Sequence, residues 1–234
     1  MWKAIGITFL VIFLAFGIYV NDYYHTDTEA VAEFLAESSV ERRELDNGNI
    51  AYVPEGATAG VIFYPGGKVE YTAYEPLMKA LADRGILSVL IKMPFNLAIL
   101  KENAADGVRE QFEGIDSWYM AGHSLGGTSA AFYADKNSDG FDGMIFLASY
   151  TTVNMSDSGL RVLSVYGSED GVLNKDKYEK NKSKLPSDFT ELVIDGANHA
   201  GFGMYGAQKK DGEATLTNTE QITKTADAIA DFIE

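Results

Sequence analysis

The first residue whose type and setting could do chemistry is a serine in a glycine-rich turn. Gly122-His123-Ser124-Leu125-Gly126 forms a G-x-S-x-G pattern between the apolar run 118–121 and the small-residue segment 128–134. A strand, a tight turn and a helix suit this pattern, because the serine must project from a strained turn flanked by residues with almost no side chain. The helix would direct the N–H of Leu125 at a reacting oxygen. Alone, the pattern fits an inert glycine-rich turn equally well.

A serine hydroxyl is a weak nucleophile until a neighbouring group accepts its proton. The chain has three histidines, His25, His123 and His199. The side chain of His123 must leave the turn in a different direction from that of Ser124, and His25 lies beside the apolar N-terminal run. His199 follows a strand expected at 189–194 and is therefore the candidate base.

A carboxylate would hold the tautomer of that histidine and stabilise the imidazolium. Asp170 comes just after a strand expected at 162–166, with Glu169 and Asp195 as competitors. Asp170 is preferred because Gly171 follows it in a sharp turn, whereas Asp195 is placed to cap the loop at the end of its own strand. The resulting order of Ser, Asp and His, each after a successive strand, is more specific than the pentapeptide.

A second oxyanion donor is expected in the turn after the strand at 61–64, where Gly66-Gly67-Lys68 offers exposed N–H groups. Gly67 is the predicted donor and Lys68 the alternative. One such donor contributes on the order of 100 to 1000-fold in rate. Lys68 and Glu70 could form an ion pair behind this turn or remain solvated loop charges.

Apolar strands and helices alternate along most of the chain. This alternation predicts an α/β fold, a mainly parallel sheet with helices on both faces. Strands are expected at about 40–45, 50–53, 61–64, 86–91, 118–121, 143–147, 162–166 and 189–194, and helices at about 28–37, 73–84, 97–103, 106–112, 128–134, 175–183 and 219–232.

The N-terminus carries an uncharged apolar run at 4–20. Its length is at the lower limit for crossing a hydrocarbon core of about 30 Å. We therefore predict a membrane anchor or signal segment at 1–24, a juxtamembrane helix at 25–39 and a catalytic domain at 40–234. Lys3 before the run and acidic residues after it favour an extracytoplasmic catalytic domain. Cleavage of residues 1–20, which would give a secreted protein, stays open, because Ala15-Phe16-Gly17 loosely resembles a cleavage site; a buried core helix is the third reading.

Composition narrows the possible partners. A formal net charge of -15 and a pI near 4.6 argue against nucleic acid and acidic lipid surfaces. The chain has no cysteine, which excludes disulfides, a cysteine nucleophile and thiolate metal sites. The absence of cysteine also suits an extracytoplasmic location.

With these motifs assembled, the chain resembles the α/β-hydrolase fold superfamily and is most similar to small bacterial serine hydrolases of the esterase-like branch. Gly-His-Ser-Leu-Gly-Gly, Tyr-Gly-Ser-Glu-Asp-Gly, Asn-His and Pro-Gly-Gly match the family's nucleophile, acid, histidine and oxyanion positions. Pro-Gly-Gly-Lys-Val-Glu replaces the more common His-Gly start, which leaves the oxyanion donor open. The resemblance implies an acyl-enzyme on Ser124, water activated by His199, and no metal or organic cofactor.

The leading hypothesis is a carboxylesterase acting on small or medium uncharged esters, including lipid esters. A lipase or thioesterase is the close alternative. A peptidase lacks any sign of a peptide groove, and a catalytically silent binding protein is the alternative from another class. Only about a dozen residues separate the strands near Leu147 and Arg161, which predicts a minimal cap and an open, shallow site. Tyr150 and Phe202, among the apolar residues near the site, could line the pocket or pack in the core.

Overall fold

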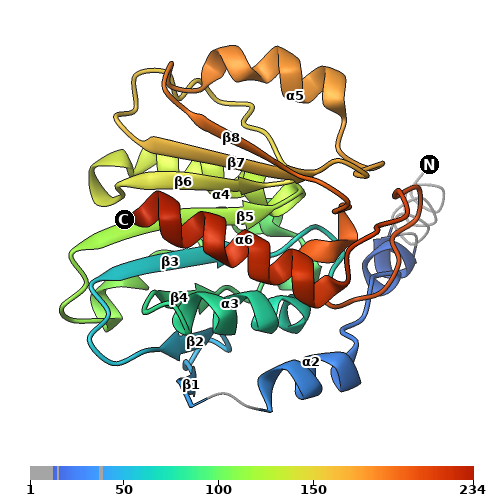
Figure 1. Cartoon of the computed structure of the whole chain (residues 1–234), viewed down its shortest axis with the longest axis horizontal. Coiled ribbons are helices and arrows are strands. Elements are labelled where there is room, and N and C mark those ends of the chain that lie inside the picture. The colour runs from blue at the N-terminus through green and yellow to red at the C-terminus, as the bar shows by residue number, and fades with distance from the viewer. Residues whose placement is uncertain (1–12, 15, 37–38) are drawn as a thin grey trace, which may run out of the picture.

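The computed structural model describes residues 13–14, 16–36 and 39–234. They contain an eight-stranded sheet in the order β1-β2-β4-β3-β5-β6-β7-β8 (Figure 1). The strands are β1 Glu41–Glu44, β2 Ile50–Val53, β3 Ala59–Tyr64, β4 Leu87–Leu90, β5 Ser117–His123, β6 Gly143–Leu147, β7 Arg161–Gly167 and β8 Thr190–Ile194. The pairings of β1 with β2 and of β2 with β4 are antiparallel, and the others are parallel.

The burial of each strand follows its place in this sheet. Every residue of β3 and β6 is buried, as expected for continuous apolar strands covered on both faces. β1 reads Glu-Arg-Arg-Glu and all four residues are exposed. Charged side chains on an edge strand discourage pairing with another chain, so β1 closes the sheet on that side.

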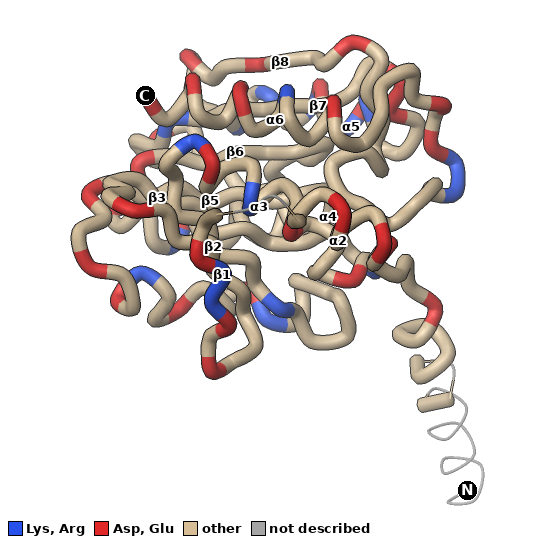
Figure 2. The backbone as a smooth tube through the Cα atoms, turned by 60° about the horizontal axis from the view of Figure 1, so that its bottom comes forward, with Lys and Arg blue, Asp and Glu red and all other residues tan. Residues whose placement is uncertain are grey.

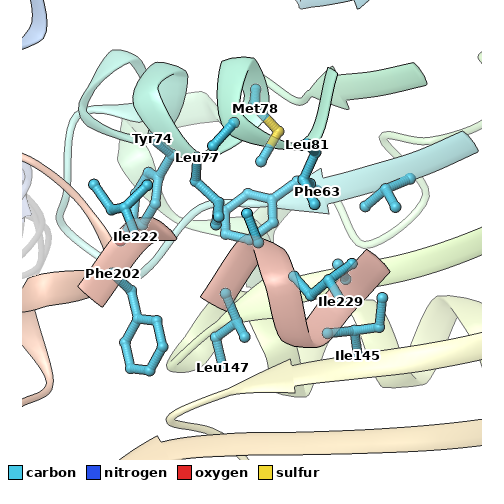
Figure 3. Packing of buried hydrophobic residues seen from close by; sticks show 14 of the residues in the cluster. Phe63, Tyr74, Leu77, Met78, Leu81, Ile145, Leu147, Phe202, Ile222 and Ile229 are labelled. Atoms are coloured by element: carbon cyan, nitrogen blue, oxygen red, sulfur yellow. The ribbon is translucent and has the colours of Figure 1, made fainter. Parts of the chain in front are cut away.

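Helices cover both faces of the sheet. α3 Glu75–Ala82 and α6 Asn218–Ile233 pack together on one face, and α4 Leu125–Lys136 packs against β5 on the other. α5 Lys175–Asn181 lies at the β8 end. Figure 3 shows the hydrophobic cluster on the face of the sheet that α3 and α6 cover. In it, Phe63 of β3 and Ile145 of β6 pack with Leu77 of α3 and Ile229 of α6. Together these layers confirm the predicted α/β fold.

The helices expected at 97–103 and 106–112 are wrong. The structure has three short 3-10 turns there, η2 Pro94–Asn96, η3 Ala98–Leu100 and η4 Arg109–Gln111. Leu97 has φ -131° and ψ 101°, Lys101 has φ -153° and ψ 66°, and Gly107 has φ 71°. A right-handed helix cannot continue through any of these conformations. The Tyr64 hydroxyl donates to Glu102 O and accepts from Ala105 N, so a side chain satisfies part of this backbone instead of a helix.

The expected helix at 73–84 is shorter in the structure. It begins as the 3-10 turn η1 Tyr71–Tyr74, and α3 starts only at Glu75, with Pro76 in its first turn. Proline is well tolerated at that position because the first N–H groups of a helix have no partner within it.

The structure describes only part of the N-terminal region for which the sequence makes predictions. The expected helix at 28–37 is α2 Thr28–Leu35, capped by Asp27, whose side chain accepts from Ala30 N. The predicted membrane segment falls mainly on residues 1–12 and 15, which lie outside the described residues. In the part of the chain that the structure does describe, none of the helices has the length and apolar character needed to span a bilayer.

Charged residues are dispersed over the fold. Figure 2 shows Asp and Glu in loops all around the sheet, with Lys and Arg scattered among them and not gathered on one face. A surface that binds nucleic acid needs clustered basic residues. That the protein does not bind nucleic acid stays a prediction.

Candidate active site

Ser124 occupies a strained turn between β5 and α4. Its backbone has φ 52° and ψ -124°, a region that residues with a side chain rarely adopt. The turn is held on both sides, because Ser124 N donates to Leu147 O at 2.9 Å and the Ser149 hydroxyl donates to Ser124 O at 2.6 Å. Ser124 is half-buried, so its hydroxyl is held at a surface that a small molecule can reach.

The glycines of the motif are required by space. A Cβ on Gly122 would lie 2.7 Å from Gly126 C, and one on Gly126 would lie 2.2 Å from Pro65 O. Neither contact can relax, because each involves backbone. The sequence therefore folds into this turn only with glycine at both positions, as the motif predicted.

His199 and Asp170 meet as the strand order predicted. His199 Nδ1 lies 2.9 Å from Asp170 Oδ2, and both side chains are almost fully buried. Asp170 Oδ1 accepts from the N–H groups of Val172 and Leu173 at 2.8 and 2.7 Å, which fixes the carboxylate. The competitors Glu169 and Asp195 instead interact with Ser168, at 2.9 and 3.5 Å.

The remaining nitrogen of His199 is free. Nε2 is buried and, among the hydrogen bonds of the described residues, has no partner. When Nδ1–H is donated to Asp170, Nε2 is the ring nitrogen left to accept a proton from a neighbouring hydroxyl. His199 and Ser124 line the same cavity. A base and a hydroxyl are thus placed at one site.

The turn after β3 lies against the start of α4. A Cβ on Gly67 would lie 2.7 Å from Leu125 Cδ2, which shows how near the two predicted oxyanion donors are. Lys68 N donates to Asn96 O at 2.8 Å, whereas Gly67 N has no acceptor among the described residues. Leu125 N opens α4 and has no acceptor within the helix. Of the two candidates in the turn, the free N–H of Gly67 is better placed for an oxyanion than that of Lys68.

The cavity at this site is small and uncharged. Its volume is about 220 Å³, and none of its lining residues is Asp, Glu, Lys or Arg. It is lined by Ser124, Leu125, Thr128, Ala148, Ser149, Tyr150, Val172, Leu173, Asn174 and His199. Tyr150 thus lines the cavity, whereas Phe202 is fully buried and its ring packs 5.5 Å from that of His123.

Two residues that support this site were missed by sequence reasoning. The hydroxyl of Tyr74 accepts from Gly66 N at 3.2 Å and lies 2.8 Å from His123 Nδ1, so it ties the oxyanion turn to the serine turn. Burial raises the pKa of Tyr74 and lowers that of His123 well below its usual value, so both are neutral near pH 7. No sequence motif marks Tyr74.

The other missed residue is Asp211. Its Oδ1 accepts from Gly171 N at 3.1 Å and from His199 N at 3.2 Å, and its Oδ2 accepts from Ala200 N at 2.8 Å. Asp211 therefore joins the loop of Asp170 to the loop of His199. In sequence it is only one charge in a polar loop after the histidine, and no spacing rule singles it out.

Across the ranges that the structure covers, no group of three or more His, Cys, Asp or Glu side chains could hold a metal ion. His199 lines the cavity, and its Nδ1 is already hydrogen-bonded to Asp170 Oδ2 behind it.

A sequence profile of the alpha/beta hydrolase family matches residues 60–223. The chain belongs to the alpha/beta hydrolase family. A search of curated proteins found no match.

Solved structures share the fold at low sequence identity. TT1662 from Thermus thermophilus is 17% identical with a TM-score of 0.61, over 84% of this chain and 99% of that one. Est1E from Butyrivibrio proteoclasticus is 16% identical with a TM-score of 0.56, over 84% and 99%. A dienelactone hydrolase from Anabaena variabilis is 13% identical with a TM-score of 0.58, over 84% and 98%. These likenesses concern the fold alone.

Proposed function

We propose that the protein is a serine hydrolase that cleaves short, uncharged carboxylic esters through an acyl-enzyme. The observation that carries this proposal is the buried 2.9 Å contact between His199 Nδ1 and Asp170 Oδ2, which leaves His199 Nε2 free in the cavity that Ser124 lines. Such an arrangement can take a proton from a hydroxyl and return it to a leaving group.

The reaction proceeds in two halves. Ser124 Oγ attacks the ester carbonyl while His199 Nε2 takes its proton, and the negative oxygen is bound by the N–H groups of Leu125 and Gly67. The imidazolium, stabilised by Asp170, then protonates the departing alcohol. Water activated by His199 attacks the acyl-enzyme in the same manner and releases the acid.

The cavity indicates the acyl group. At about 220 Å³ it is smaller than the roughly 300–1,000 Å³ of drug-sized ligand sites. Its lining carries no formal charge, so a charged acyl group would be desolvated there without a partner. A short, neutral acyl chain is the substrate that fits. One of the solved structures that share the fold is a dienelactone hydrolase, and a lactone is a cyclic ester, which lends support to ester chemistry.

The experiment is hydrolysis of p-nitrophenyl esters from acetyl to palmitoyl, with labelling by a fluorophosphonate probe. We expect acetyl and butyryl esters to be cleaved fastest, and Ser124→Ala to lose labelling and at least 1000-fold in kcat/KM. Ser183→Ala is the control, because its hydroxyl bonds only Lys180 O at the surface. Labelling that survives in Ser124→Ala would remove this serine as the nucleophile.

Other outcomes favour the alternatives. A preference for long chains would indicate a lipase, and faster cleavage of acyl thioesters a thioesterase. A wild-type protein that neither labels nor turns over any ester would indicate a silent binding protein on the same fold.

For location we propose that residues 1–24 hold the catalytic domain at the outer side of a membrane. The support is the uncharged run at 4–20, with Lys3 before it and Asp22 after it. Cell fractionation of the full chain tests this, since recovery in the medium would show cleavage and release.

A further inference from the structure

Residues 22–27, which we call the N-terminal strap, run along the turn that carries the oxyanion donor. Tyr24 N donates to Lys68 O at 2.8 Å, and Glu70 N donates to Tyr24 O at 2.9 Å, so Tyr24 pairs with Val69 as in a parallel sheet. Thr26 N donates to Glu70 Oε2 at 2.9 Å. Gly67 directly precedes this paired stretch.

Side chains strengthen the same contact. Asp22 Oδ2 lies 2.9 Å from Lys68 Nζ, and the Thr26 and Thr72 hydroxyls are 2.6 Å apart. Lys68 therefore pairs with Asp22, and the ion pair with Glu70 considered from the sequence does not form. Lys68 itself has φ 61°, a value that L-residues hold only when the surroundings fix it.

The strap also reaches the loop that follows His199. The Tyr24 hydroxyl accepts from Lys209 N at 3.0 Å, and its ring lies 5.7 Å from that of Tyr205. Asp27 N donates to Met204 O at 2.8 Å. One segment of six residues thus contacts both loops that the proposed reaction requires.

We propose that Tyr24 is a positioning residue, which holds the oxyanion turn in register with the histidine loop. This inference rests on the proposed function. Tyr24 touches neither substrate nor reacting atoms. Its backbone fixes Lys68–Glu70, and its side chain fixes 205–209, so the distance between Gly67 N and His199 depends on it. Misplacement of such groups by about 1 Å can cost up to 100-fold in rate.

The test compares full-length variants on the best ester. We expect Tyr24→Ala to lower kcat about tenfold with KM within twofold, because an oxyanion is bound in the transition state and not in the ground state. Tyr24→Phe removes only the hydroxyl bond to Lys209 and should give a smaller loss. Tyr23→Ala is the matched control, since the one aromatic ring that the ring of Tyr23 contacts in the described chain is that of His25.

Hydrogen exchange separates positioning from stability. The amides of Glu70 and Lys209 donate hydrogen bonds to Tyr24, so they should exchange faster in Tyr24→Ala. The amides of β5 should stay protected, and the Tm should change little. An unchanged kcat in Tyr24→Ala, with the wild type active, would overturn the inference. If the wild type cleaves no ester, the proposed function fails, and unchanged exchange at both amides would then reject the strap independently.

Discussion

Ser124, Asp170 and His199 were identified from the sequence because each lies directly after a strand. In a parallel sheet the carboxyl ends of neighbouring strands share one edge, so residue position along the chain predicts proximity in space. The 2.9 Å contact between Asp170 and His199 spans 29 residues and was expected on that basis. Their roles in catalysis remain the proposal that the serine variant tests.

Tyr74 could not be found in this way. Its contact with His123 spans 49 residues and joins a 3-10 turn to a strand, and no periodicity relates the two. Only the packed structure shows that a phenol connects the oxyanion turn with the serine turn. The same holds for Ser149, whose hydroxyl bonds the carbonyl of Ser124.

We expect Tyr74→Phe to lower kcat about tenfold while KM changes little. The ring remains, but Gly66 N loses its acceptor, so the turn bearing Gly67 is held less firmly. Steady-state kinetics on a short ester measures the effect. Tyr64→Phe, which also loses a buried hydroxyl bond but on the opposite face, should keep its kcat. Equal losses in the two variants would point to general destabilisation.

Among the elements, the strands were predicted to within about two residues and the irregular stretch 94–112 was not. Apolar runs are sufficient to locate buried strands, because burial on both faces needs nothing else. Helices were expected at 97–103 and 106–112, yet the non-helical backbone of Leu97 and Lys101 and the positive φ of Gly107 interrupt them. A side chain from β3, Tyr64, then supplies the missing backbone partners.

The loops after β7 and β8 depend on Asp211. In Asp211→Ala the N–H groups of Gly171, His199 and Ala200 lose their acceptor. Gly171 is exposed to water, but His199 and Ala200 are buried. An unsatisfied N–H in a buried residue costs about 1–3 kcal/mol, so we expect a lower Tm and a loss of at least tenfold in kcat/KM. Asp211→Asn keeps one accepting oxygen and should be intermediate. Thermal unfolding and ester kinetics are the measurements.

The control for that loop is Asp231→Ala. Asp231 is exposed on α6 and carries the same charge, without any contact to the two loops. Activity retained in Asp211→Ala at unchanged Tm would show that the loops hold their positions without this carboxylate.

For the whole molecule, His123 links stability to pH. Burial lowers its pKa well below 6.5 in the folded protein, whereas the unfolded chain titrates near 6.5. Below about pH 6.5 the unfolded state therefore binds a proton that the folded state does not, and stability falls as pH falls. Stability that is fully present above pH 6.5 is lost at up to about 1.4 kcal/mol per pH unit.

Urea unfolding between pH 7.5 and 5.5 measures this slope. His123→Asn, which retains an oxygen near Tyr74 but cannot titrate, should show a shallower dependence than the wild type. Equal slopes in the two proteins would mean that His123 accepts its proton in the folded state as readily as in the unfolded chain.

The connection between β6 and β7 has a consequence for product release. Residues 148–160 contain neither helix nor strand, so nothing in this stretch is large enough to fold over Ser124. If the protein is the hydrolase proposed above, no domain in this connection has to move before the products leave. The chemical steps, and not a conformational opening, would then limit the rate of turnover.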